Sequence, residues 1–211
     1  MATKEEIKEF RDGIFALRTR RFGTVAEIMI KHLYNMSEAH NLAFDKYSET
    51  EGRVEVKFST VMKENDDKIR DTNVIEQCKK ANLANRAMVS DDIDKGIPFD
   101  CNIQQVKTNE FQVLYYGLFF ADCVEIFEMT REQVLLCPGY SNKQHRGNEE
   151  KGNSTLTKEL FSFIRTTISR NASHMKSYMN FLKTYNDKKS GEIYFPPLLA
   201  IKMSRIVWYR C

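Results

Sequence analysis

The stretch FDKYSETEGRVEVKFS, residues 44–59, decides how this sequence is interpreted. Two short β-prone runs, residues 42–47 and 53–59, stand on either side of a polar connector, Ser-Glu-Thr-Glu-Gly. A five-residue connector that contains glycine between such runs is typical of a β-hairpin. The sequence therefore predicts a hairpin here, and its charged residues make it either a solvated surface pairing or the edge of an active site.

The alternation of side chains along a strand shows which charged residues of this hairpin can lie close together. Glu55 and Lys57 point the same way, about 7 Å apart, while the residues between and beside them face a core; these core residues are Val54, Val56 and Phe58. An antiparallel partner strand can bring Asp45 beside Glu55. Two carboxylates at one point suit Mg²⁺, and a nearby lysine can stabilise charge on a phosphate. The alternative is that these charges form an ordinary cross-strand surface pairing.

The composition excludes several classes of protein. The chain has 211 residues, of which 42% are hydrophobic and 29% charged, as in a globular domain. No apolar run is long enough to span a membrane and no secretory signal opens the chain, so we expect a cytoplasmic protein with no membrane partner. The five cysteines and four histidines are scattered, which predicts neither a disulfide framework nor a zinc site.

Charge is distributed unevenly along the chain. Residues 1–140 contain 19 Lys and Arg against 24 Asp and Glu, whereas residues 141–211 contain 13 against 5. A basic last third is a candidate surface for a polyanion such as a nucleic acid. The alternative is a solvated basic face without a partner.

Helical periodicity before the hairpin predicts two helices, one over residues 4–18 and one that begins at a capping box formed by Thr24 and Glu27. A third helix is expected over residues 73–88. The strands expected after it cover residues 102–106, 111–120 and 123–129, and the middle one is apolar enough to be buried on both faces.

The last third is expected to be less regular at its start. Residues 138–154 are predicted to form a long exposed loop, followed by helices over residues 155–170 and 173–186. A boundary near residue 138 would separate a core, residues 1–137, from a basic loop and helices, residues 138–211. We expect both parts to belong to the same domain.

The order helix, hairpin, helix, strands, with TVAEIMIKHL before AFDKYSETEGRVEVKFS, resembles the PD-(D/E)xK nuclease superfamily, and most closely its type II restriction endonucleases. By motif, Asp45 matches the first acid, Glu55 the second acid and Lys57 the lysine. Glu27 matches an acid that the family often carries on the preceding helix, where it holds a metal-bound water or a second ion. The resemblance covers about residues 22–130 and implies an α/β (α+β) fold with a mixed central sheet flanked by helices, a restriction-endonuclease-like core.

The sequence departs from the motif at one position, and a second local match competes with the first. Phe44 stands where the motif has its proline, a position that varies in the superfamily. A second local match, Asp100 with Gln105-Val106-Lys107, leaves no room for a hairpin between the acid and the glutamine, so we rank it lower. The side chains of Gln104, Gln105 and Lys107 are nevertheless candidates for the lining of the cleft.

The predicted loop after residue 140 is rich in side chains that can contact base edges and phosphates. The candidate DNA-binding residues are Asn142, Lys143, Gln144, His145, Arg146, Asn148 and Lys151. The alternative for them is a polar linker. The helices that follow carry further basic residues, Arg165 and Lys183 among them. Such helices can lie on the phosphate backbone or can pack as a dimer face.

The resemblance implies a Mg²⁺-dependent, sequence-specific double-strand DNA endonuclease, a type II restriction enzyme of a prokaryotic cell. Double-stranded DNA would be its substrate, and a homodimer is expected because two-fold symmetry matches a palindromic site. Two alternatives stay open, namely a repair or structure-specific nuclease of the same superfamily and a non-catalytic DNA-binding module.

Overall fold

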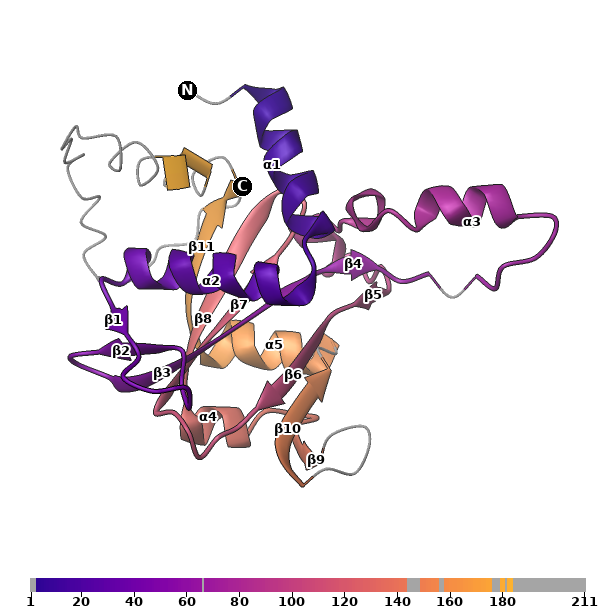
Figure 1. The fold of residues 1–211 in the computed structure, drawn as a ribbon. Helices are drawn as coiled ribbons and strands as arrows, with labels where there is room; N and C mark the ends of the chain where they lie inside the picture. Colours follow the sequence, from indigo (N-terminus) through magenta and orange to yellow (C-terminus); the bar gives the residue numbers. More distant parts are fainter. Residues whose placement is uncertain are drawn as a thin grey trace.

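The computed structural model describes residues 3–65, 67–143, 149–155, 158–175, 179–180 and 182–183. Of residues 102–105, 141–143, 149–155, 158 and 169–174 it describes the backbone. The described chain folds around a mixed sheet with helices on both faces (Figure 1). The α+β class expected from the sequence is therefore confirmed.

The central sheet has six strands in the order β1-β2-β3-β7-β8-β11. Strands β3 and β7 are parallel, and every other neighbouring pair is antiparallel. The strands are β1 (Ser37–Glu38), β2 (Lys46–Ser48), β3 (Gly52–Thr60), β7 (Val113–Phe119), β8 (Cys123–Thr130) and β11 (Ser169–His174). Strand β3 thus joins the hairpin of the predicted active site to the buried strand β7.

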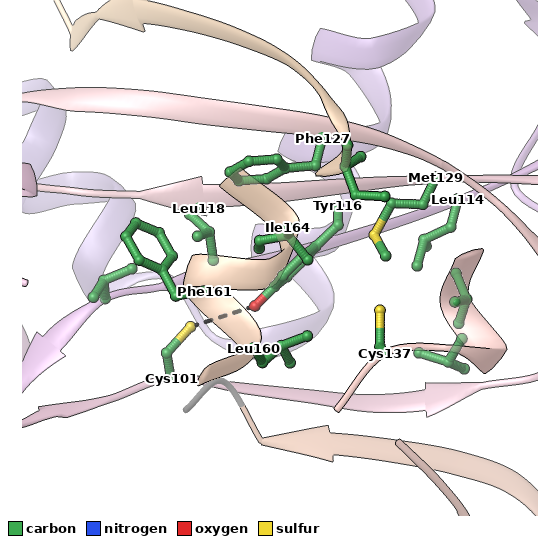
Figure 2. Close-up of a cluster of buried hydrophobic side chains, with 14 of the residues drawn as sticks. Cys101, Leu114, Tyr116, Leu118, Phe127, Met129, Cys137, Leu160, Phe161 and Ile164 are labelled. Carbon is green, nitrogen blue, oxygen red and sulfur yellow. Dashed lines mark hydrogen bonds between the residues drawn. The ribbon is translucent and has the colours of Figure 1, made fainter. Parts of the chain in front are cut away.

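Two hydrophobic clusters cover the two faces of this sheet, and β7 contributes alternate residues to each. Val113 and Tyr115 pack with helices α1 (Lys4–Ala16) and α2 (Thr19–Leu33). Leu114 and Tyr116 pack with α4 (Arg131–Leu135) and α5 (Lys158–Thr167), as Figure 2 shows for α5. Burial on both faces explains why the sequence of β7 is almost continuously apolar.

A long crossover connects β3 to β7. It contains β4 (Met62–Lys63), α3 (Val74–Lys80), the 3₁₀ turns η1 (Leu83–Arg86) and η2 (Ser90–Asp92), β5 (Phe99–Asp100) and β6 (Asn102–Val106). Strands β4 and β5 pair with each other, and α3 projects away from the sheet (Figure 1). The helix predicted over residues 73–88 is therefore real but shorter.

The expected loop over residues 138–154 is wrong for most of its length. Strands β9 (Ser141–Lys143) and β10 (Glu149–Thr155) join β6 in a three-stranded antiparallel sheet. The polar sequence hides these strands because backbone pairing with a distant strand, not side-chain propensity, stabilises them. The described helix and strand of the last third are also part of the main body, since α5 packs in one of the two clusters and β11 pairs with β8.

Three further boundaries differ from the sequence predictions. Helix α2 begins five residues before Thr24, whose hydroxyl donates to the backbone carbonyl of Arg20 in mid-helix at 3.1 Å, so there is no capping box here. Leu42 is fully exposed and precedes the strand expected to contain it. The helix predicted from residue 173 gives way to β11, although residues 175, 179–180 and 182–183 are helical.

Among the described helices, none is long and apolar enough to cross a membrane.

Candidate active site

Asp45, Glu55 and Lys57 meet at the edge of β3. The ammonium group of Lys57 lies 3.8 Å from a carboxylate oxygen of Asp45 and forms a close ion pair with Glu55. Glu55 is 7% exposed, and the side chain of Lys57 is 26% exposed. The ammonium group of Lys57 therefore contacts both carboxylates that the sequence predicts to lie together, those of Asp45 and Glu55.

The register of the hairpin explains this convergence. Strand β2 pairs with β3 from Lys46, opposite Val54, to the turn, and the two chains part beyond that point. The backbone N–H of Asp45 donates to the carbonyl of Val54 at 3.0 Å, and its carboxylate accepts from the N–H of Val56 at 2.8 Å. The carboxylate of Asp45 thus accepts the hydrogen bond that a backbone carbonyl of β2 would accept from Val56 if the two strands were still paired there.

The two faces of β3 differ as alternation requires. Val54 and Val56 pack in the cluster of helices α1 and α2. Glu55 and Lys57 stand opposite Leu114 and Tyr116 of the parallel strand β7, whose side chains pack on the other face. The predicted division of this strand into a charged face and a core face is therefore confirmed.

Burial shapes the electrostatics of the site. It raises the pKa of the Glu55 carboxyl to about 7, because the attraction of Lys57 only partly offsets the loss of solvation and the repulsion from Asp45. Burial lowers the pKa of Lys57, but Glu55 and Asp45 outweigh this and the net shift is upward. Glu27 is close enough to add to that upward shift. Near neutral pH, Glu55 exchanges a proton while Lys57 keeps its charge.

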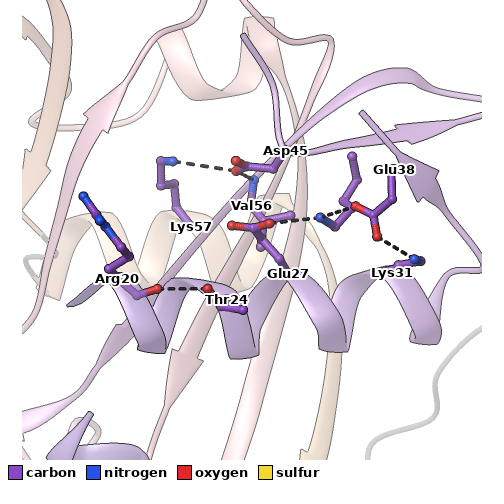
Figure 3. A network of polar contacts seen from close by, with 9 residues as sticks. Arg20, Thr24, Glu27, Lys31, Glu38, Asp45, Val56 and Lys57 are labelled. Carbon is purple, nitrogen blue, oxygen red and sulfur yellow. Dashed lines mark hydrogen bonds and ion pairs between the residues drawn. The ribbon is translucent and has the colours of Figure 1, made fainter. Parts of the chain in front are cut away.

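Glu27 belongs to a neighbouring network that is centred on Lys46. Its carboxylate lies 2.9 Å from the ammonium group of Lys46, which also lies 3.0 Å from Glu38, and Glu38 lies 2.5 Å from Lys31 (Figure 3). Lys46 is 5% exposed. Because Lys46 stands opposite Val54, its side chain lies on the α2 face of the sheet, where Glu27 can reach it.

Sequence reasoning missed Lys46 and Glu38. Lys46 follows Asp45 directly, so alternation alone places it on the opposite face from that acid, toward the preceding helix. Its burial has an electrostatic consequence. Burial lowers the pKa of Lys46, but hydrogen bonds to Glu27 and Glu38 outweigh it, so the net shift is upward and the residue stays charged.

The other predicted site residues lie in different places. Lys107 donates to both carboxylate oxygens of Glu110, each at 2.9 Å. Gln104 and Gln105 lie on β6, Asn142 and Lys143 on β9 and Lys151 on β10, where the backbone is described. The remaining candidates for DNA contact lie outside the described residues; these are Gln144, His145, Arg146 and Asn148.

Two basic residues expected on a phosphate-binding face are instead paired with acids. Arg165 donates to both carboxylate oxygens of the buried Glu125, at 2.6 and 3.3 Å, and lies 3.3 Å from Asp94. Lys183 lies 2.9 Å from Glu6 of α1. The prediction that these side chains are available for phosphate is wrong for Arg165, whose guanidinium holds α5 to β8.

The donors at the edge of β3 match the needs of one hard cation. Mg²⁺ is commonly held by one or two carboxylates with water in the remaining positions, and Asp45 and Glu55 are two such donors. Within the described parts of the chain, no group of three or more His, Cys, Asp or Glu side chains is arranged to hold a metal ion. Any ion here would therefore keep most of its ligands as water or substrate oxygen.

No model of a known protein family, no curated protein and no solved structure matches this chain.

Proposed function

We propose that this protein is a Mg²⁺-dependent endonuclease that hydrolyses phosphodiester bonds of double-stranded DNA at specific sequences, a type II restriction enzyme with a restriction-endonuclease-like core. The observation that carries the proposal is the contact of one lysine ammonium group, Lys57, with both Asp45 and Glu55 at the edge of β3. The resemblance of the surrounding sequence to the PD-(D/E)xK superfamily supports the same reaction.

Each of the three residues has a role that follows from its surroundings. Asp45 and Glu55 would hold the ion, and Asp45 is already oriented by the N–H of Val56. The bound ion would polarise the phosphodiester and lower the pKa of a water molecule. Lys57, which stays protonated, would contact the phosphate and stabilise the negative charge that develops on it.

Glu27 would act through Lys46, not as a direct ligand. Its ion pair with Lys46 fixes α2 against the residue that follows Asp45. A carboxylate in that position keeps a buried ammonium group in place and so stabilises the end of the hairpin that carries Asp45. We therefore assign Glu27 a positioning role in the proposed reaction.

Two other functions use the same residues differently. A repair or structure-specific nuclease would use the same centre on nicked, branched or terminal DNA. A non-catalytic DNA-binding module would use the charged edge of β3 only as a surface. The close grouping of two carboxylates and a lysine in a half-buried position favours an enzyme over the module, because burial of unneeded charges costs stability.

Incubation of the purified protein with a long linear duplex of known sequence, in Mg²⁺ and then in EDTA, distinguishes these functions. Discrete reproducible fragments that require Mg²⁺ support the restriction enzyme. Nicks, trimmed ends or cleavage confined to branched DNA support the repair nuclease. Absence of cleavage in Mg²⁺, Mn²⁺ and Ca²⁺ contradicts an enzymatic function.

A further inference from the structure

One face of helix α2 runs along the helix to the candidate active site. Residues at intervals of four, three and four positions share a face of an α-helix, and here they are Arg20, Thr24, Glu27 and Lys31. Figure 3 shows all four on the side of α2 that faces Asp45 and Lys57. We call these four residues the α2 stripe.

The lysines in and beside the α2 stripe form ion pairs with acids, whereas its arginine forms none with the described residues. Lys31 lies 2.5 Å from Glu38, and Lys46 lies between Glu38 and Glu27. Arg20 is exposed, and in the described residues its guanidinium takes part in no ion pair and no hydrogen bond. The same holds for its exposed neighbours Arg18 and Arg21.

The acid of α1 that is nearest in sequence to α2 is already paired with two cations. Asp12 of α1 is contacted by Lys8 at 2.6 Å and by Arg11 at 2.6 Å. The start of α2 therefore presents three guanidinium groups within four residues and no described carboxylate that neutralises them. Guanidinium groups are suited to phosphate because their fork of N–H donors matches its oxygen atoms.

The charge around the α2 stripe favours such a cation for an anionic substrate as long as no metal ion is bound. The two neighbouring networks contain four carboxylates and three ammonium groups, so they carry an excess of negative charge when all are ionised. A polyanion that approaches Lys57 would be repelled by this excess. The unpaired arginines at the other end of the stripe supply an attraction that the centre itself lacks.

We propose that Arg20, supported by Arg18 and Arg21, binds a backbone phosphate of the DNA strand whose reacting phosphate lies at Lys57. This inference rests on the proposed function and names a substrate contact outside the basic last third of the chain. Arg20 lies seven residues from Glu27, about 10 Å along the helix axis. A strand that follows the stripe carries one phosphate per about 3.4 Å of its axis. Arg20 would then meet a phosphate about three nucleotides from the one nearest Glu27.

The test is DNA binding by the full chain, measured by fluorescence anisotropy with a labelled 30-base-pair duplex across a range of NaCl concentrations, in EDTA and in Ca²⁺. The variant is Arg20→Ala. The matched control is Arg70→Ala, which removes another exposed guanidinium without a described ion pair, on the segment before α3. Both are surface substitutions that leave folding intact, which thermal unfolding verifies.

The expected result is that Arg20→Ala weakens DNA binding about tenfold at low salt. It should also reduce the slope of log K against log salt by about 0.9, the value for one lost phosphate contact. Arg20→Lys should restore part of the slope, and Arg70→Ala should match the unaltered protein.

Two results would overturn the inference, and they are distinguishable. If the unaltered protein binds DNA and Arg20→Ala binds it with the same affinity and slope, the phosphate contact at Arg20 is wrong and the proposed nuclease function stands. If the unaltered protein binds no DNA in EDTA or in Ca²⁺, the proposed function fails, and the inference fails with it.

Discussion

The carboxylate of Asp45 accepts a 2.8 Å hydrogen bond from the backbone N–H of Val56, the residue between Glu55 and Lys57. This bond ties the end of one strand to the middle of another at the position where their backbone pairing has stopped. The same oxygen of Asp45, Oδ2, lies 3.8 Å from the ammonium group of Lys57, but the hydrogen bond needs only an acceptor and not a charge. The bond and the charge of Asp45 can therefore be removed separately.

Asp45→Asn should keep the hydrogen bond, because an amide oxygen also accepts from Val56, and should remove the charge. We expect stability close to that of the unaltered protein and a loss of Mg²⁺ binding, measured by calorimetric titration. Asp45→Ala removes both and should also lower the free energy of unfolding by about 1–3 kcal/mol, because the Val56 N–H loses its partner. Equal stability of the two variants would contradict the role of the bond.

The raised pKa of Glu55 predicts how stability depends on pH. Its pKa is about 7 in the folded protein against 4.5 for the model carboxyl, so folding favours the protonated form. The stabilising contribution is fully present below pH 4.5 and is lost as the pH rises to about 7. Glu55→Gln should therefore be more stable than the unaltered protein above pH 7, by about 1–3 kcal/mol, and about equal at pH 4.5.

Denaturant unfolding at several pH values between 4.5 and 8.5 measures this difference. Glu49→Gln is the matched control, since Glu49 is an exposed glutamate in the turn of the same hairpin. A constant difference between Glu55→Gln and the unaltered protein across this range would refute the assignment of the titration to Glu55.

Lys46→Met should destabilise the protein, because Glu27 and Glu38 would lose a cation that contacts both. We expect a loss of about 1–3 kcal/mol, less than for a fully buried pair because the two carboxylates are partly exposed. The control is Lys80→Met, which also removes a lysine between two acids, Asp67 and Glu76, at a more exposed position. Similar losses of thermal stability in both variants would show that the Lys46 network contributes nothing beyond a surface pair.

Arg165→Ala should lower stability and leave DNA affinity unchanged. The guanidinium donates to both oxygens of Glu125, which is 3% exposed, so its removal leaves a buried carboxylate without its cation. We expect a loss of about 2–4 kcal/mol in denaturant unfolding, and only partial recovery in Arg165→Lys, which lacks the fork. Weakened DNA binding at unchanged stability would restore Arg165 as a phosphate contact.

The sequence allowed the centre of the fold to be predicted because its patterns there are local. Alternation on β3 separates Glu55 and Lys57 from Val54 and Val56, and the apolar run of β7 indicates burial on both faces. These two strands position the candidate site. Neither pattern alone shows that β3 of the predicted hairpin pairs in parallel with β7.

The features that the sequence did not reveal depend on contacts between distant segments. Strand β10 is polar and exists through pairing with β6, some 50 residues earlier. The sequence alone predicts that Arg165 is a surface cation, because its ion pair with Glu125 depends on how α5 packs against β8. The partner of Glu27 became visible only once the register of β2 set Lys46 on the α2 face. In each case, tertiary pairing decides what a local pattern leaves open.

If Lys57 acts with Asp45 and Glu55 in cleavage, Lys57→Ala should lose activity, and the rate of duplex cleavage in Mg²⁺ measures this loss. Lys95→Ala, an exposed lysine paired with Asp92, is the control. We expect Lys57→Ala to cut at least about 10²-fold more slowly while its DNA affinity stays within about twofold of that of the unaltered protein. Cleavage by Lys57→Ala at the rate of the unaltered protein would contradict this role of Lys57.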